Sequence, residues 1–153
     1  MGLEDELYAH MPVVKATLWL TSKEHRLEEL GEELLSAGTR LGNMEDCPDA
    51  SKKAGYACHS WEYWVELKHC YGMELAFDRL YEDCVRPRMD ALRRAQQQGW
   101  EVTFEFVVHM WCGENPALCL SAKAMEVIAS LHGEFGIDLY DYERGEVEDD
   151  DAP

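Results

Sequence analysis

The stretch that decides the fold is WEVTFEFVVHMW, residues 100–111. Large apolar side chains occupy every second position along it: Trp100, Val102, Phe104, Phe106, Val108 and Met110. The positions between them begin with Glu101, Thr103 and Glu105, so the pattern has a period of two. This period predicts a half-buried β-strand and fits a helix poorly. After Glu105 the second face also turns apolar, which predicts that the far end of the strand is covered on both sides.

Other segments show the same alternation. Residues 13–20, VVKATLWL, place Val14, Ala16, Leu18 and Leu20 on one side. Residues 59–68 alternate His59, Trp61, Tyr63, Val65 and Leu67 with mainly polar residues. Both segments are predicted strands. We also expect a short returning strand at 117–120 and a closing strand at 137–143, with Ile137 and Leu139 facing the core.

Three segments are predicted helices because their apolar residues recur every three or four positions. The first, 22–37, follows a capping box of Thr21 and Glu24 and stops at Gly38. The second, 73–98, carries Phe77, Leu80, Tyr81, Cys84 and Leu92 inward and is kinked or divided by Pro87. The third, 122–135, is capped by Ser121, broken by Gly136, and turns Met125, Ile128, His132 and Phe135 inward.

The predicted order is βα, a long surface loop at 39–57 that can hold a short strand, then βαββαβ. We therefore predict an α+β fold: a mainly antiparallel sheet packed by about three helices, with a ferredoxin-like βαββαβ core preceded by a βα unit. The predicted organisation is a flexible N-terminus (1–12), one domain (13–143) and an acidic disordered tail (144–153).

The chain is strongly acidic, with 31 Asp and Glu against 14 Lys and Arg and a formal net charge of −17. More than half of this charge lies on residues 7–143. Such a field repels nucleic acid and anionic lipid, and it attracts cationic partners; solubility is the simpler explanation. No apolar run is long enough to span a bilayer, and residues 1–10 lack the features of a secretory signal. We expect a cytoplasmic protein.

Cysteine and histidine pairs are the main chemical candidates. The chain has six cysteines, which we expect to be reduced and mostly structural. Cys58 with His59, His69 with Cys70, and His109 with Cys112 could converge on a metal, but none has the spacing of a recognised zinc site. His109 and Cys112 are also the pair to name for a cysteine nucleophile, without a local motif in support. We predict no metal, no cofactor and no catalytic residue.

Arginines 86, 88, 93 and 94 form the one basic cluster. They could grip a phosphate or carboxylate, but helical pairs of Glu82 with Arg86 and Asp90 with Arg94 explain them more simply. Phosphate-binding glycine motifs are absent from the sequence. Pairs of carboxylates are common in a chain this acidic, so they do not identify it as a glycosidase.

The order and spacing of residues 13–143 resemble a known family. The segment ALCLSAKAMEVIASLHGEFGIDLYDYE (117–143), the mid-chain Trp61, and Thr39, Arg40 and Gly42 are similar to the uncharacterised bacterial domain of unknown function four-two-seven-nine. The segment CGENP (112–116) departs from the family pattern. The resemblance implies a bacterial cytoplasmic domain that is sometimes encoded beside polymorphic-toxin genes, where small acidic proteins serve as immunity factors.

We therefore predict a non-catalytic, immunity-type protein that neutralises a cognate toxin with a basic surface. A nuclease effector is the natural target, because carboxylates can mimic phosphates. The predicted partner-binding residues are Glu28, Glu29, Glu32, Glu33, Glu45, Asp46, Asp49, Trp64 and Trp111. Trp19, Trp64 and Trp111 can be exposed anchors or can lie covered on the second face of the sheet. The alternative is a small-molecule or metal-binding domain with a cleft lined by His and Cys. The sequence leaves the oligomeric state open.

Overall fold

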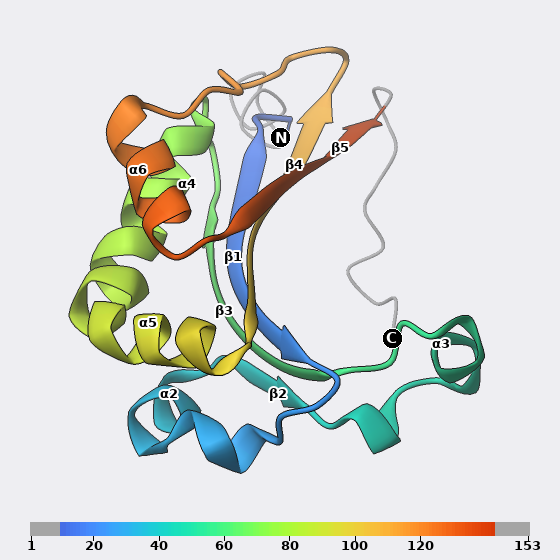
Figure 1. The fold of residues 1–153 in the computed structure, drawn as a ribbon. Coiled ribbons are helices and arrows are strands. Elements are labelled where there is room, and N and C mark those ends of the chain that lie inside the picture. The colour runs from blue at the N-terminus through green and yellow to red at the C-terminus, as the bar shows by residue number, and fades with distance from the viewer. Residues whose placement is uncertain (1–9, 143–153) are drawn as a thin grey trace.

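The computed structural model describes residues 10–142, and its α+β class is the predicted one (Figure 1). Within these residues the strands form one five-stranded mixed sheet: β1 (Val13–Ser22), β2 (Arg40–Gly42), β3 (His59–Leu67), β4 (Glu101–Trp111) and β5 (Glu134–Tyr142). The predicted strands at 13–20, 59–68 and 100–111 are confirmed. The predicted acidic tail and most of the predicted N-terminal segment lie outside the described residues.

The order of strands across the sheet is β2-β3-β1-β4-β5. β1 pairs antiparallel with β3 and with β4, whereas β5 runs parallel to β4. The first strand of the chain is therefore the central strand of the sheet. Register pairs such as Leu18 with Phe104 and Leu18 with Tyr63 align the apolar rows of three strands on one face.

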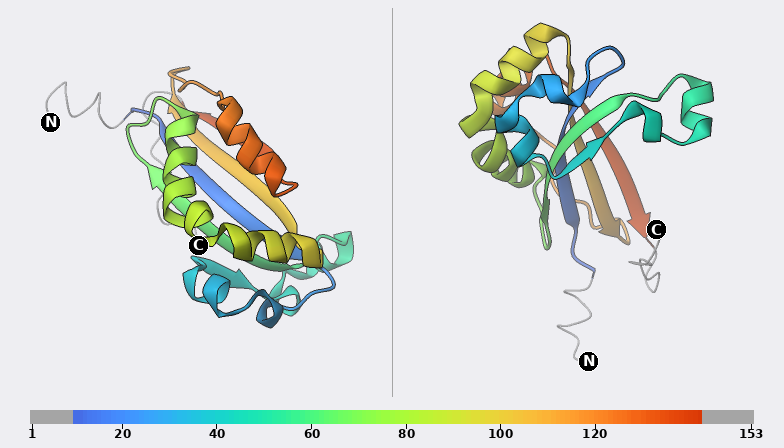
Figure 2. Two further views of the ribbon diagram at one scale, coloured as in Figure 1. Left: turned by 60° about the vertical axis from the view of Figure 1, so that its left-hand side comes forward. Right: turned by 90° about the horizontal axis from the view of Figure 1, so that it is seen from below.

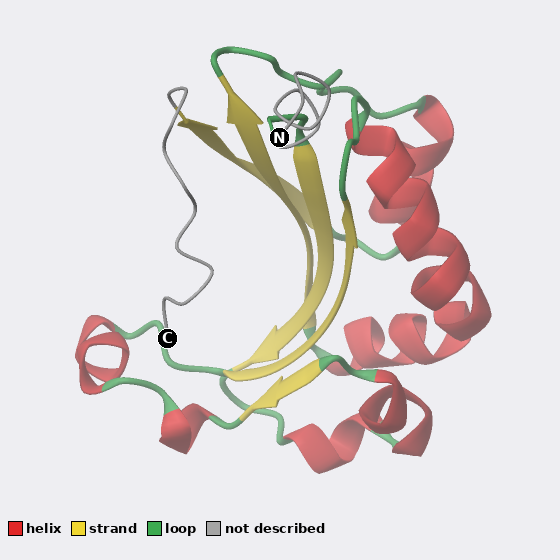
Figure 3. Ribbon diagram, turned by 180° about the vertical axis from the view of Figure 1, so that it is seen from behind, coloured by secondary structure: helices red, strands yellow, loops and turns green. Residues whose placement is uncertain are grey.

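Helices cover that apolar face. They are α2 (Glu32–Ala37), α4 (Met73–Leu80), α5 (Met89–Gln98) and α6 (Ala122–Ser130), with the 3-10 turn η1 (Leu27–Leu30) beside α2. Figures 2 and 3 show α4, α5 and α6 on the same side of the bent sheet, over its convex face. Fully buried side chains fill the space between: Leu18, Leu20, Leu34, Trp61, Phe77, Leu80, Leu92, Phe104, Phe106 and Leu131. Burial of each such side chain contributes about 1.5 to 3 kcal/mol to folding.

The strand order does not confirm the ferredoxin-like arrangement. The predicted returning strand at 117–120 is wrong: Ala117 forms only an isolated bridge with Gly72, at the start of α4. Its N–H donates to the Tyr71 carbonyl at 2.8 Å and its carbonyl accepts from Met73 N–H at 2.9 Å. The chain reaches the sheet again only at β5, after α6.

The predicted continuous helix at 22–37 is wrong in its first half. Ser22 Oγ accepts the N–H groups of Glu24 and His25, which forms a turn directly after β1. The predicted capping box of Thr21 and Glu24 does not form; instead the Arg26 N–H donates to the Glu29 carboxylate, and the Glu29 N–H donates to the Arg26 carbonyl at 3.0 Å. Gly31, at φ +83°, then separates η1 from α2. A helix cannot continue through this left-handed residue. Gly38 ends α2 as predicted.

The long predicted helix at 73–98 is confirmed with its division at Pro87. After α4 the chain makes a π turn, η3 (Tyr81–Val85), and a 3-10 turn, η4 (Arg86–Arg88), before α5. Gly99, at φ +109°, ends α5 as predicted. The wider turn accommodates the missing N–H and the bulk of the proline ring.

The third helix ends earlier than predicted, at Ser130. His132 takes φ +50° and Gly133 N–H donates to the Ile128 carbonyl, so the chain reverses before Phe135. Gly133 leaves room for this close approach, because an added Cβ would lie 3.2 Å from that carbonyl oxygen. Gly136 is no breaker; it lies inside β5 together with Phe135. Met125 and His132 are exposed rather than buried, whereas the Ser121 cap is confirmed.

The predicted long loop at 39–57 contains the expected short strand, β2. It also holds two short helical turns, η2 (Met44–Asp46) and α3 (Asp49–Ala54), which Figure 3 shows projecting from one end of the sheet. Among the helices of residues 10–142, none has the length and apolar character to cross a membrane.

Candidate functional site on the concave face

The face of the sheet opposite α4, α5 and α6 is concave (Figure 3). The side chains that alternate with the core rows point to this face. In the register, Thr17 lies between Trp64 of β3 and Glu105 of β4, and Trp19 lies between Glu62 and Thr103. We call the surface formed by these alternate residues of β1, β3, β4 and β5 the concave face.

Carboxylates outnumber basic groups on the concave face. The register places on it the acids Glu62, Glu66, Glu101, Glu105, Glu134 and Asp138. The basic side chains that the register places there are Lys15 of β1 and Arg40 of β2. Part of the chain's excess negative charge therefore lies on the concave face of the sheet.

Glu105 is at the centre of this surface. Its Oε2 accepts a hydrogen bond from Trp19 Nε1 at 3.1 Å. Desolvation raises the pKa of Glu105 above its ordinary value, and a hydrogen bond and charge repulsion from Asp138 raise it further. Because Glu105 is partly removed from water and lies beside a second carboxyl group, its environment favours the protonated form or contact with a cation.

Glu62 is a second partly desolvated carboxylate. The residue is only 5% exposed, and Arg40 Nε lies 3.8 Å from its Oε1. Burial raises the pKa of Glu62, while the charges of Arg40 and Lys15 lower it in part. Lys15 itself lies over the ring of Trp64, with its Nζ 4.3 Å from the ring centroid. A cation already stacks on this aromatic side chain, as expected where an indole faces a positive charge.

Aromatic rings gather where β4 and β5 end. The His109 ring stacks on Tyr140 and Tyr142, with centroids 5.2 and 5.8 Å apart. His109 Nδ1 and the Tyr142 hydroxyl are hydrogen-bonded at 2.8 Å. Trp111 contacts Tyr142 and His10, and it is 7% exposed. This cluster covers the second face at the far end of the strand, as the apolar residues after Glu105 predicted.

The predicted partner-binding acids lie away from the concave face. Glu28 and Glu29 are in η1, Glu32 and Glu33 in α2, Glu45 and Asp46 in η2, and Asp49 in α3, and all are exposed. Arg26 connects two of these groups, because its guanidinium lies 3.8 Å from Glu28 and 3.9 Å from Glu45. Of the predicted aromatic residues, Trp64 is half-buried on the concave face and Trp111 is buried. Their role in binding stays a prediction.

The sequence prediction missed Lys15, Glu62, Glu105 and Asp138. The signal was present, because the same alternation that identifies the buried face of each strand also identifies its other face. What could not be seen was that the partner strands align these residues and that no helix of the described chain covers them.

The cysteines are all free. Cys84 is fully buried in η3, and burial raises its pKa to about 12, which makes it a packing residue. Cys112 is an exposed turn residue at φ +54°, directly after β4, the strand that contains His109. His59 is buried, and its Nδ1 accepts the Met44 N–H. Across residues 10–142, His, Cys, Asp and Glu side chains form no group of three that could hold a metal ion.

The arginine cluster is engaged in part in local contacts. Arg86 pairs with Glu82 at 2.7 Å, as predicted for this helical spacing. Arg94 pairs with Glu33 of α2 at 3.9 Å, rather than with the predicted Asp90. Arg88 donates to the carbonyls of Asp83 and Cys84 in the π turn. These contacts support the structural explanation of the cluster.

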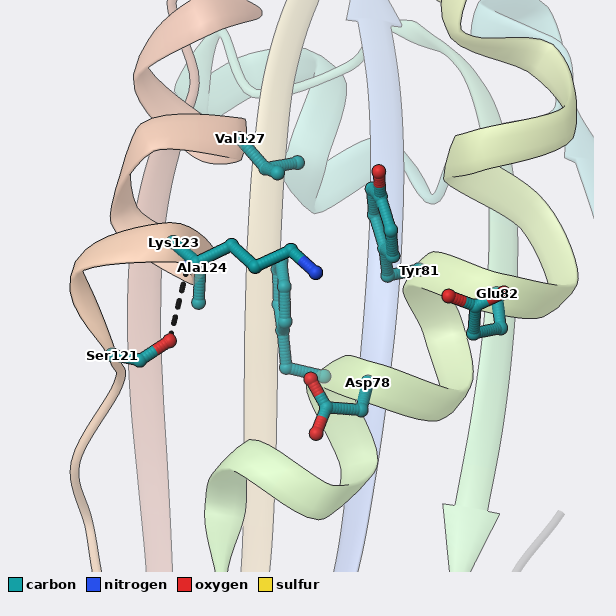
Figure 4. A pocket seen from close by; sticks show the side chains of 8 residues that line it. Asp78, Tyr81, Glu82, Ser121, Lys123, Ala124 and Val127 are labelled. Carbon is teal, nitrogen blue, oxygen red and sulfur yellow. Dashed lines mark hydrogen bonds between the residues drawn. The ribbon is translucent and has the colours of Figure 1, made fainter.

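A cavity of about 310 Å³ lies between α4, η3 and α6 (Figure 4). Phe77, Ala124 and Val127 supply apolar walls, and Asp78 and Glu82 supply carboxylates. Lys123 reaches across the pocket toward Tyr81, whose ring centroid is 5.8 Å from the Lys123 Nζ. Two other clefts contain Cys58 and His132, respectively. The small-molecule or metal-binding alternative requires a cleft lined by both His and Cys. None of these three clefts contains both residue types.

No family model matches the chain, and neither does any curated protein or solved structure. The resemblance to domain of unknown function four-two-seven-nine therefore stays a prediction.

Proposed function

We propose that the chain is a non-catalytic binding domain of a bacterial cytoplasm, an immunity-type factor that binds a basic surface of a cognate toxin and neutralises it. The observation that carries this proposal is the concave face, where Glu62, Glu105 and Asp138 lie among tryptophans on a rigid sheet. A sheet surface holds its side chains in fixed relative positions, which reduces the entropy lost on binding.

The physical mechanism has two stages. The negative field of the molecule first attracts a cationic partner and raises the association rate. Basic side chains of the partner then meet Asp138, which is exposed, and Glu105, which is half-buried. The partly desolvated carboxylate of Glu105 gains more from a cation than a carboxylate in water does. Trp19 and Trp64 provide flat apolar area beside them, the kind of residue that dominates binding energy at protein interfaces.

A nuclease effector is the toxin class that this surface favours. A nuclease binds phosphates, so its active site is cationic, and a row of carboxylates can occupy the same positions. The outer acids of η1, α2, η2 and α3 would extend the negative surface toward such a partner. They would contribute mainly to steering, because exposed ion pairs are worth about 0 to 1 kcal/mol each.

The test begins with the protein encoded by the neighbouring gene, which should co-purify with this chain. Association is then measured by stopped-flow fluorescence at several salt concentrations. We expect the double variant Glu105→Gln and Asp138→Asn to slow association by about threefold or more at low salt and to weaken its salt dependence. The matched control is Glu82→Gln with Glu126→Gln, which removes the same charge from the helical side. Equal rates for both variants, or no complex, would contradict the proposal.

The outer acids are tested separately. Charge reversal at Glu28, Glu29, Glu32 and Glu33 should slow association with little effect on the dissociation rate, as expected for steering charges. The small-molecule or metal-binding alternative has less support, because the three clefts described above bring no His and Cys together. Stoichiometric zinc in the purified full-length protein would favour it over the binding domain.

A further inference from the structure

β5 is an edge strand whose protection is limited to acidic side chains, Glu134, Asp138 and Asp141. It spans nine residues and, within residues 10–142, pairs on one side only, with β4. It contains no proline, lysine or arginine. The opposite edge is protected by its length, because β2 has only three residues and includes Arg40. Long, unprotected edges offer a row of backbone N–H and C=O groups to another strand.

The side chains of β5 are also unusually exposed for their type. Phe135 is 52% exposed and Leu139 is 49% exposed on the helix side of the strand, and Tyr140 is 49% exposed on the concave side. Ile137, between Phe135 and Leu139, packs against the core. The strand is thus anchored through its middle, and it leaves apolar side chains on both flanks that another strand could cover.

The two sides of β5 differ in chemistry. Phe135, Ile137 and Leu139 align with the apolar row of β4 on the helix side. Glu134, Gly136 and Asp138 align with Thr103, Glu105 and Val107 on the concave side. An added strand would continue this alternation. Its side chains would be apolar next to Phe135 and Leu139, and basic next to Glu134 and Asp138.

Charge decides between the possible occupants. A second copy of this chain would bring the acids of one β5 against those of the other, and like charges on neighbouring strands are destabilising. The segments outside the described residues carry Glu4, Asp5 and Glu6 at one end and mainly acids at the other, so charge disfavours them as well. The complementary occupant is a cationic segment of another protein.

We propose that β5 binds an extended segment of the toxin as a sixth strand, in which basic and apolar residues alternate. This inference rests on the proposed function in taking the partner to be a basic protein. Main-chain hydrogen bonds to the edge of β5 would supply affinity, and the alternating side chains would supply specificity, as in other cases of strand addition.

The test uses the full chain and a defined probe, a fluorescein-labelled ten-residue peptide of alternating lysine and valine. We expect binding by fluorescence anisotropy and slower amide hydrogen exchange in residues 134–142. A fully N-methylated peptide keeps the side chains and charge but cannot donate main-chain hydrogen bonds, and it should bind at least about tenfold more weakly.

The matched variants are Leu139→Lys and Leu75→Lys. Both add one positive charge at an exposed leucine, but Leu75 lies on α4, where it is 58% exposed. We expect Leu139→Lys to weaken peptide binding about tenfold and Leu75→Lys by less than twofold, with thermal unfolding confirming that both variants fold. A conservative Leu139→Met variant should retain binding.

Three results would overturn the inference: equal binding of the N-methylated peptide, protection outside β5, or equal losses from the two lysine variants. If the protein is a dimer and the amides of β5 exchange slowly without peptide, a second copy of the chain occupies the edge. If they exchange slowly in a monomer without peptide, the chain's own termini occupy it. These failures leave the proposed function intact, because a toxin can bind the concave face without adding a strand. Conversely, if no toxin partner is found, the peptide experiment still tests whether the edge of β5 accepts a strand.

Discussion

Glu105 links the stability of the molecule to pH. Its pKa is raised above the ordinary 4.5, mainly by desolvation and then by Asp138, so the folded protein holds this proton more tightly than the unfolded chain. The contribution of protonated Glu105 to the free energy of unfolding is therefore complete below about pH 4.5, and it is lost as pH rises through the raised pKa. At neutral pH the ionised carboxylate is a cost to folding that the hydrogen bond from Trp19 only partly offsets.

We predict that Glu105→Gln makes the protein at least as stable as the wild type at pH 7. An amide needs no proton to be neutral, and its oxygen can still accept from Trp19 Nε1. The advantage of the variant should shrink as pH falls from 7 toward 4, which urea unfolding at fixed pH values measures. The matched substitution Glu126→Gln, at an exposed carboxylate on α6, should show no such trend. A difference that grows on acidification would mean that the pKa of Glu105 is lowered, not raised.

Gly38 shows a second effect of a single residue. A Cβ added there would lie 2.5 Å from Trp61 Nε1, and this indole donates to the Leu34 carbonyl at 2.6 Å in the core. The missing side chain is thus what lets a fully buried tryptophan satisfy its N–H group.

Gly38→Ala should therefore lower the free energy of unfolding by about 1 to 3 kcal/mol, because it overpacks the core and displaces a buried hydrogen bond. The control is Gly136→Ala in β5, where an added Cβ meets nothing within 4 Å. There we expect no loss, and a gain of up to about 1 kcal/mol, because glycine in a strand is disfavoured relative to alanine. Urea unfolding of both variants gives the comparison, and equal effects would contradict the close-approach argument.

Among the elements, α6 begins at the cap that its sequence predicted. Ser121 Oγ accepts the Ala124 N–H at 3.2 Å, and Glu74 Oε1 accepts the Ser121 N–H at 2.6 Å. The hydrogen bonds with Ser121 hold the pKa of Glu74 below its ordinary value. One carboxylate of α4 thereby fixes where α6 starts.

Ser121→Ala should cost about 1 kcal/mol of stability, the usual effect of removing an N-cap. Ser130, at the other end of the helix, donates to the Val127 carbonyl from an exposed position. Ser130→Ala should therefore change stability by less than about 0.5 kcal/mol. Guanidinium unfolding followed by circular dichroism separates the two, and a larger loss at Ser130 would show that the cap does not hold the helix.

Elements defined by local patterns could be predicted from the sequence. The alternation in β1, β3 and β4, the proline that divides 73–98 and the cap at Ser121 each depend on residues a few positions apart. The errors arose where a nearby glycine or turn competed with a good helical pattern. Gly31 interrupts the leucine-rich segment at 22–37, and the turn at His132 and Gly133 transfers Phe135 from a helix to β5.

At the scale of the whole molecule, strand order and the concave face could not be predicted. Both depend on β1 pairing with β4, for example Trp19 with Thr103, and no local pattern encodes which distant strand is the neighbour. Glu105 and Asp138 come together only because β5 runs parallel to β4. The charge balance did predict an acidic surface, but the total charge does not say which elements carry the acids of the concave face.

The central place of β1 has a consequence for synthesis of the protein on the ribosome. One neighbour of β1, β3, is available by residue 67, but the other, β4, is complete only at residue 111. Until then a row of fully buried residues, Val14, Ala16, Leu18 and Leu20, lacks half of its enclosure in the growing chain. Closure of the core must wait for contacts between distant parts of the sequence, which slows folding. The nascent N-terminal half is therefore the stage at which a chaperone has most to shield.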